Sequence, residues 1–253
     1  MKGDREMAAP ATPEASSPVI EPWNRPFRQR IPRPASASAG SPAPWSGLPI
    51  CERRSIGLDR AVADLSELLL PVSREPEPRP QAAILVTLFE RDGDALTALI
   101  RRPLSMASNP GDLAFPGGRL EPGENAAAAA LREAEEEVGL RPETVSMLGR
   151  LPAVSRSRQS ESVVPYVGVL AGEPSFRACP GEVDAIIEVA LSDLAGEDSY
   201  WEEEWHVQGS GSRSLCFFAH QKALADEVIW GMTARVIRDL LSFVLLHERS
   251  GVS

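Results

Sequence analysis

The segment from Phe115 to Leu140, FPGGRLEPGENAAAAALREAEEEVGL, constrains this chain more than any other part of it. Two turns rich in glycine and proline come before a run of alanines, and alanine has the highest helix propensity of all residues. Asn125 is a good N-cap, and Gly139 suits the position just beyond a helix C-terminus. The segment therefore predicts a loop, a helix over about residues 126–138 and a second loop.

Three glutamates of the predicted helix share one face. At about 100° per residue, the side chains of Glu133, Glu136 and Glu137 fall within a narrow sector of the helix surface. Arg132 comes four residues before Glu136, a spacing at which a guanidinium can pair with a carboxylate. An adjacent sector is apolar and suits docking onto a sheet. We therefore expect a carboxylate cluster beside the buried side of the helix.

Such a cluster is unfavourable unless its charge is compensated, because like charges on one helix face repel each other. A hard cation such as Mg²⁺ would compensate it, since this ion prefers oxygen ligands and also binds phosphate groups. The chemistry favours metal-assisted hydrolysis of a phosphorus–oxygen bond, with a carboxylate accepting the proton of water. A solvated, glutamate-rich surface helix is the alternative if the carboxylates are considered alone.

The spacing of the segment favours the first interpretation. Seven fully specified positions would match an unrelated sequence at roughly one start in 10⁸. They are Gly118, Glu124, Arg132, Glu133, Glu136, Glu137 and Gly139. The segment Gly118–Leu140 resembles the Nudix box of the Nudix hydrolases, with every defining position present. The resemblance implies an enzyme that acts on nucleoside-diphosphate-linked substrates with Mg²⁺ or Mn²⁺ as cofactor.

The resemblance also implies a fold and a set of site residues. The fold is of the α+β class, a Nudix-type α/β/α sandwich with a mixed sheet, a loop–helix–loop catalytic box and a C-terminal helix. By their positions in the box, Glu136 and Glu137 match metal ligands, and Glu133 matches a carboxylate that binds metal or acts as general base. Arg132 matches the orienting arginine of the catalytic set, and the Gly117 carbonyl matches a further metal ligand. Glu124 matches an acid that assists them.

The flanks of the box resemble the coenzyme A diphosphatase branch of the family, from about Ala82 to Leu245. Arg102 and Gly111 fit the motif that this branch carries upstream of FPGG, but Ala107 stands where the motif has a second arginine. Arg156, after the box, either contacts phosphate or is a loop arginine that faces water. The substrate-binding candidates are therefore Arg102, Gly118 and Arg156.

The resulting hypothesis is hydrolysis of coenzyme A or an acyl derivative to 3′,5′-ADP and (acyl-)4′-phosphopantetheine. Ala107 keeps open a second hypothesis, a pyrophosphatase that acts on ADP-ribose, an NDP-sugar or another nucleotide. The third is a non-catalytic nucleotide-binding module. Modules of that kind usually lose glutamates of the box, and here none is lost.

The rest of the chain is expected to form a disordered, Pro/Ala/Ser-rich tail over residues 1–56 and one domain over residues 57–248. Strand-like runs cover residues 82–90 and 95–102, joined by a turn at Asp92-Gly93-Asp94, and residues 162–170, 183–191 and 213–220. Helical spacing covers about residues 58–69 and 233–247, the second with Thr233 as N-cap. The acidic run WEEEW at 201–205 is expected to be a surface loop, and Trp230 to pack against the last helix.

Charge and cysteine content limit the partners. With 26 Lys+Arg against 36 Asp+Glu the net charge is −10, which argues against general nucleic-acid binding, and no apolar run is long enough to cross a membrane. Three scattered cysteines and a polar start without an apolar signal region favour a reducing, cytoplasmic location. The expected partner is a small nucleotide substrate resembling coenzyme A, and this interpretation allows a homodimer.

Overall fold

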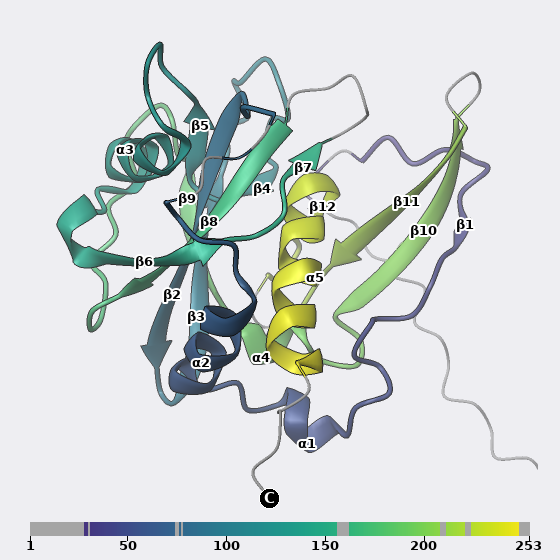
Figure 1. The fold of residues 1–253 in the computed structure, drawn as a ribbon. Coiled ribbons are helices and arrows are strands. Elements are labelled where there is room, and N and C mark those ends of the chain that lie inside the picture. Colours follow the sequence, from purple (N-terminus) through teal and green to yellow (C-terminus); the bar gives the residue numbers. More distant parts are fainter. Residues whose placement is uncertain are drawn as a thin grey trace, which may run out of the picture.

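The computed structural model describes residues 28–29, 31–73, 76, 78–155, 162–207, 211–220 and 224–247 (Figure 1). A large mixed sheet lies on one side of the molecule and a small antiparallel sheet on the other, with the C-terminal helix α5 (Gly231–Leu246) between them (Figure 1). This α+β architecture agrees with the fold class expected from the sequence.

The large sheet is built on the predicted hairpin. Strands β2 (Ala82–Arg91) and β3 (Asp94–Arg101) pair antiparallel around a turn in which Asp92 and Gly93 have φ angles of 53° and 83°. The order along the sheet is β4-β3-β2-β8-β6, with β5 and β7 paired to β2 and β8, and β9 paired to β3. Only the β2–β8 pair is parallel among the strand pairs of the described residues. The remaining strands are β4 (Leu113–Ala114), β5 (Gly117–Arg119), β6 (Val145–Arg150), β7 (Val154–Ser155), β8 (Ser162–Leu170) and β9 (Ala185–Ala190).

Helices cover both faces of this sheet, because side chains along a strand alternate between its faces. On β2, Ala83 and Leu85 join a core beneath helix α3 (Ala126–Val138), whereas Val86 and Leu88 join the core beneath α5. The second core also receives helix α2 (Leu58–Leu68), which follows the predicted 58–69 spacing. The predicted α/β/α layering is therefore present. Short helices complete the described chain at α1 (Ile50–Arg53), η2 (Pro142–Thr144) and α4 (Leu191–Leu194).

The small sheet corrects one sequence-based expectation. The WEEEW run lies in strand β10 (Tyr200–Val207), which pairs with β11 (Gly211–Phe218), and is not a surface loop. Strands β1 (Ser38–Ala39) and β12 (Ile229–Trp230) complete the sheet, in the order β1-β10-β11-β12. The carboxylate of Glu203 can be buried in β10 because Arg33 and the Trp205 indole both donate hydrogen bonds to it.

The prediction of a disordered tail is wrong for residues 31–56. Trp45 is completely buried, stacks on Phe218 at 6.3 Å between ring centroids, and donates its indole N–H to the carbonyl of Ala195. β1 adds this segment to the edge of the small sheet. The segment lacks an apolar period because it is held by single large side chains and not by a repeating face. Residues 1–27 lie outside the described residues.

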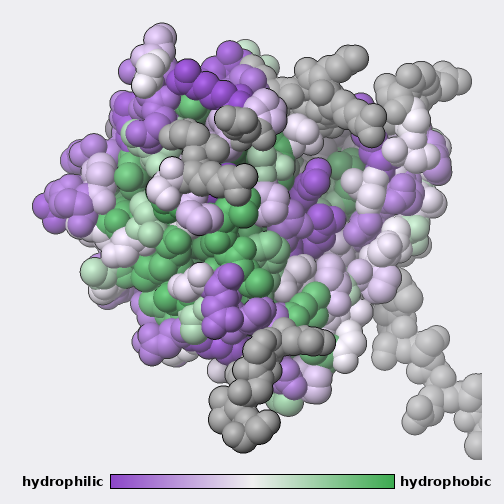
Figure 2. Space-filling view, in the orientation of Figure 1, coloured by the Kyte–Doolittle hydropathy of each residue, from purple (hydrophilic) through white to green (hydrophobic). Residues whose placement is uncertain are grey.

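The last helix also differs in detail from the expectation. It begins at Gly231 with Trp230 as N-cap, so Thr233 is not the cap. In the described part of the chain, no helix combines the length and apolar character needed to span a membrane. Figure 2 shows an apolar area on the face where α2, β6 and α5 lie. Leu70, two residues after α2, and Leu246, the last residue of α5, are exposed.

Candidate active site

Backbone packing fixes the loop that precedes the catalytic box helix. Strand β5 pairs antiparallel with β2, with Gly117 opposite Ile84 and Gly118 opposite Ala83. Gly117 has a φ of 151°, and a Cβ atom there would lie 2.4 Å from the carbonyl oxygen of Ala83. Only glycine therefore fits this position without moving the central strand.

Helix α3 forms where the sequence predicts it. The Asn125 side chain accepts a hydrogen bond from the Ala128 N–H at 2.8 Å, as an N-cap should, and Gly139 ends the helix with a left-handed φ of 67°. Ala126, Ala129, Ala130, Ala134 and Val138 are buried against the sheet. The helix is thus held on one side by packing, and the carboxylate-bearing part of its surface faces the loop before it.

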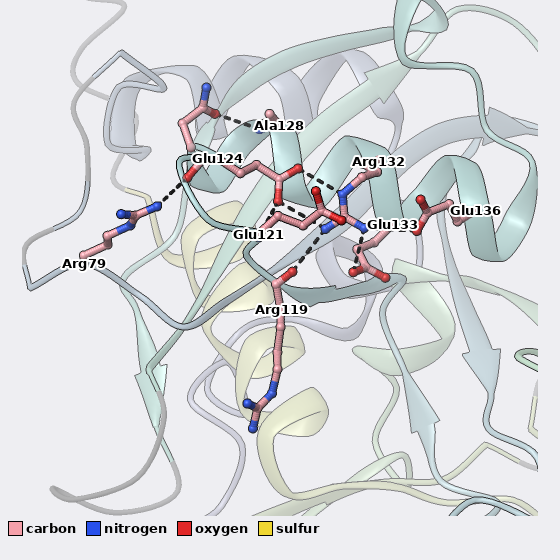
Figure 3. A network of polar contacts seen from close by, with 9 residues as sticks. Arg79, Arg119, Glu121, Glu124, Ala128, Arg132, Glu133 and Glu136 are labelled. Atoms are coloured by element: carbon pink, nitrogen blue, oxygen red, sulfur yellow. Dashed lines mark hydrogen bonds and ion pairs between the residues drawn. The ribbon is translucent and has the colours of Figure 1, made fainter.

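Arg132 is the centre of the polar network on this surface (Figure 3). It donates two hydrogen bonds to Glu124, at 2.9 and 3.1 Å, and one each to Glu133 and Glu136, both at 3.0 Å. A further bond, 3.1 Å long, reaches the carbonyl of Arg119 in β5. The Arg132–Glu136 ion pair expected from the sequence is present, and the same guanidinium also ties the helix to the loop.

Two supports of this loop were not anticipated from the sequence. Arg79, just before β2, donates to the Glu124 carbonyl at 2.8 Å (Figure 3), and the Glu121 N–H donates to the Glu124 carboxylate at 2.9 Å. Arg132 lowers the pKa of Glu124 through their hydrogen bonds, so this carboxylate stays charged. Only the fixed interval between Glu124 and Arg132 could have signalled the pair, because the two residues are not helical neighbours.

Glu133 lies directly against the glycine turn. A Cβ atom on Gly118 would lie 2.3 Å from a carboxylate oxygen of Glu133, so the absent side chain leaves the space that this carboxylate occupies. Gly118 was expected to bind substrate, and here its contact is with Glu133. The box thus pairs a glycine in the loop with a carboxylate on the helix.

Glu137 occupies a different environment from the other glutamates. It is buried, and one of its carboxylate oxygens accepts a hydrogen bond from the Gly117 N–H at 2.9 Å. Burial raises the pKa of Glu137 to about 7, and the nearby charge of Glu133 acts in the same direction. Glu136, by contrast, is exposed, with 53% of its side-chain surface accessible.

The three carboxylates are not drawn together as a ready metal cluster. Within the described residues, no set of three or more His, Cys, Asp or Glu side chains could hold a metal ion as it stands. Two of the glutamates instead share the Arg132 guanidinium, and the third turns to a backbone N–H. Glu133 and Glu136 therefore share one donor and Glu137 has another, which partly offsets the repulsion among the three carboxylates.

Arg102, which directly follows β3, lies close enough to Glu137 for its charge to act on that carboxylate. Its charge lowers the pKa of Glu137 against the effect of burial, and its Nη2 donates to the Ser108 carbonyl at 3.3 Å. Its Nε is buried and has no hydrogen-bond partner among the residues that the structure describes. A buried donor of this kind is costly unless an acceptor is supplied to it. Arg156, the other arginine candidate, lies outside the described residues.

Comparison with known proteins assigns the family. The NUDIX domain model matches residues 78–207, which contain the whole of this site. The chain belongs to the Nudix hydrolase family. The Nudix hydrolase NudL of Shigella flexneri serotype 5b, described as uncharacterized, is 34% identical over 190 residues, covering 75% of this chain and 95% of that protein. The NudL of Enterobacter sp. strain 638 is 35% identical over 191 residues, with the same shares covered.

Solved structures of Nudix proteins also resemble this Nudix chain, at lower similarity. An Ap4A hydrolase of C. elegans in a binary complex is 22% identical and matches 47% of this chain and 86% of that chain, with a TM-score of 0.40. The NUDIX domain of Shewanella oneidensis NrtR with ADP ribose is 18% identical and matches 52% and 84%, with a TM-score of 0.37. The Nudix match begins just before β2 and ends with β10, so α2, α5 and strands β11 and β12 lie outside it.

Proposed function

We propose that this Nudix hydrolase uses Mg²⁺ or Mn²⁺ to cleave a diphosphate bond in a nucleoside-diphosphate-linked substrate, and that this substrate is coenzyme A or an acyl derivative. Water adds to one phosphorus and the bridging oxygen leaves with the other phosphate, giving 3′,5′-ADP and (acyl-)4′-phosphopantetheine. The observation that carries this proposal is the buried carboxylate of Glu137, which is held by the Gly117 N–H and lies within the electrostatic range of Arg102.

The donor atoms fit a hard divalent cation. Glu133, Glu136 and Glu137 would hold it together with the Gly117 carbonyl, all through oxygen. A positive ion would also relieve the cost of a charged Glu137, whose pKa is raised to about 7 by burial and by Glu133. When bound, the ion lowers the pKa of water and offsets the charge of the diphosphate.

The remaining roles belong to side chains of the chain itself. Arg132 orients Glu133 and Glu136 through one nitrogen that donates to both. Glu133, held beside the turn at Gly118, is placed to accept a proton or to bind the ion. Arg102 supplies a positive charge for a phosphate oxygen.

Ala107 favours a second candidate substrate. It is exposed in the loop between β3 and β4, at the position where the coenzyme A branch motif carries its second arginine. Loss of that cation would weaken binding of the additional phosphate of coenzyme A. A substrate with the diphosphate alone, such as ADP-ribose or an NDP-sugar, would not need it.

A substrate panel tests the proposal. The purified full chain is incubated with coenzyme A, an acyl-coenzyme A, ADP-ribose and an NDP-sugar, each with Mg²⁺, with Mn²⁺ and with EDTA, and products are separated by chromatography. We expect 3′,5′-ADP from coenzyme A only when the metal is present. Release of products from ADP-ribose but not from coenzyme A would refute coenzyme A as the substrate and support the second candidate.

A matched pair of variants tests the site in the same assay. Glu136→Gln removes a charge from an exposed proposed ligand and is expected to lower kcat by about 100-fold. Glu135→Gln makes the same change one residue earlier, on an exposed side chain that helical geometry places about 200° around the helix from Glu133, and is expected to leave the rate unchanged. Equal rates for the two variants would contradict the assignment of Glu136 to the active site.

A further inference from the structure

The segment 227–230, which ends with strand β12 of the small sheet, contacts both ends of the loop that carries Arg102. This loop, residues 102–112, connects β3 to β4. At its start, the Arg101 Nε donates to the carboxylate of Glu227. At its end, the Trp230 indole N–H donates to the Asp112 carboxylate at 3.1 Å. Glu227 and Trp230 are three residues apart, just before and within β12.

The contact at the start of the loop is buried. Only 4% of the Glu227 side chain and 16% of the Arg101 side chain are accessible, and Arg101 also donates to Asp184 at 3.0 Å. Breaking a buried ion pair leaves a charge without compensation, so this contact resists displacement. Arg101 is the last residue of β3 and its side chain reaches Glu227, whereas the side chain of the next residue, Arg102, donates to the Ser108 carbonyl within its own loop.

The contact at the end of the loop reaches Arg102 through the backbone. The Asp112 carbonyl accepts a hydrogen bond from the Arg102 N–H at 3.0 Å, and the Arg102 carbonyl accepts one from the Gly111 N–H at 3.1 Å. Trp230 itself is held in an aromatic cluster, with its ring 6.4 Å from that of Trp205. A shift of Trp230 would therefore move Asp112, and with it the backbone of Arg102.

We propose that Trp230 and Glu227 are positioning residues that fix Arg102 for binding the anionic part of the substrate. The inference rests on the proposed function, in which Arg102 contacts a phosphate. Neither residue touches the substrate: Trp230 acts through Asp112 and Glu227 acts through Arg101. Both belong to the part of the chain beyond residue 207, where the Nudix match ends.

Trp230→Phe tests this, because it removes the indole N–H and keeps an aromatic ring in the cluster. With coenzyme A and Mg²⁺, we expect KM to rise about five-fold to ten-fold and kcat to change less than two-fold, since Arg102 binds the substrate and its transition state alike. Trp205→Phe is the matched control. Trp205 belongs to the same aromatic cluster as Trp230, but its indole N–H donates to Glu203 and not to loop 102–112. An equal rise of KM in both variants would overturn the proposal.

A double-mutant cycle separates this inference from the function on which it rests. Arg102→Ala alone should raise KM, and Trp230→Phe should then add nothing, because both act on one interaction. Additive effects would overturn the positioning role and leave Arg102 as a binding residue. An Arg102→Ala variant with normal KM on every substrate would overturn the assigned role of Arg102, and the positioning role with it. If Trp230→Phe does not fold, Glu227→Gln enters the same cycle with the same expectations.

Discussion

Arg132 holds Glu124 through two side-by-side hydrogen bonds, from Nε to Oε1 at 2.9 Å and from Nη2 to Oε2 at 3.1 Å. Lysine cannot reproduce this two-bond geometry, because its ammonium group is a single point of charge. The pair joins the loop of the box to its helix, and the same guanidinium orients the carboxylates that follow. The relative position of loop and helix therefore depends on this pair, together with the hydrogen bond from the Gly117 N–H to Glu137.

Arg132→Lys should lower kcat by about 10-fold to 100-fold while the protein stays folded. The substitution keeps the charge but loses the planar set of donors that orients Glu133 and Glu136, and such supporting contacts are worth about this much. Steady-state kinetics with the preferred substrate, together with circular dichroism, provide the measurement. Arg141→Lys is the control, because its ion pair with Glu143 is exposed on both sides, and it should behave like the parent. A fully active Arg132→Lys would contradict the orienting role.

Gly118→Ala should inactivate the enzyme mainly by displacing Glu133. The new methyl group would lie 2.3 Å from the Glu133 carboxylate, and a shift of about 1 Å in a reacting group can cost about 100-fold in rate. Gly123→Ala is a useful contrast, since Gly123 has a φ of 85° with open space around it. That change should cost about 1 kcal/mol of stability and little activity. Activity and urea unfolding of both variants would show whether the two effects separate in this way.

The burial of Glu137 predicts how stability depends on pH in the presence of EDTA. Its pKa is raised from 4.5 to about 7, so between these values the folded state binds more protons than the unfolded state. The contribution of Glu137 to the free energy of unfolding should therefore be largest below pH 4.5. It should fall by about 3 kcal/mol as the pH rises toward 7. Urea unfolding across this range measures the decline. Glu137→Gln should remove most of it, and an unchanged slope in that variant would refute the assignment.

Trp45→Ala should destabilise the protein by about 3–5 kcal/mol, the usual cost of removing a large buried aromatic side chain. Trp45 is completely buried and packs on Tyr200 and Phe218. Leu246→Ala, at a site that is 41% exposed, should cost less than about 1 kcal/mol. Thermal unfolding of the two variants provides the comparison, and equal losses would mean that residues 31–56 do not contribute to the core.

The parts of the fold that the sequence predicts well are those decided by local chemistry. The cap at Asn125, the left-handed end at Gly139 and the Asp92-Gly93 turn each act on a few neighbouring residues, so their patterns are legible without knowledge of the fold. The Arg132–Glu136 pair belongs to the same class, because its spacing within the helix is sufficient to bring the two side chains together.

The parts that the sequence does not predict depend on distant partners. Glu203 is buried in a strand because Arg33, 170 residues away, neutralises it, and nothing near the WEEEW run indicates that partner. Trp45 lies in a segment without apolar period and is buried by residues beyond position 190. The environment of Glu137 depends on the Gly117 N–H, which lies in the preceding loop and is not part of a helical wheel.

The two-residue strand β1 has a consequence for the edge of the small sheet. It pairs with Glu203 and Glu204 of β10, and the adjacent Gly40 N–H bonds to the Glu202 carbonyl, so part of the outer backbone of this strand is already occupied. Without β1, the backbone N–H and C=O groups on this edge of β10 would be unpaired. Another chain could then pair with them as an added strand. We therefore expect that removal of residues 31–56 would expose this edge and favour aggregation.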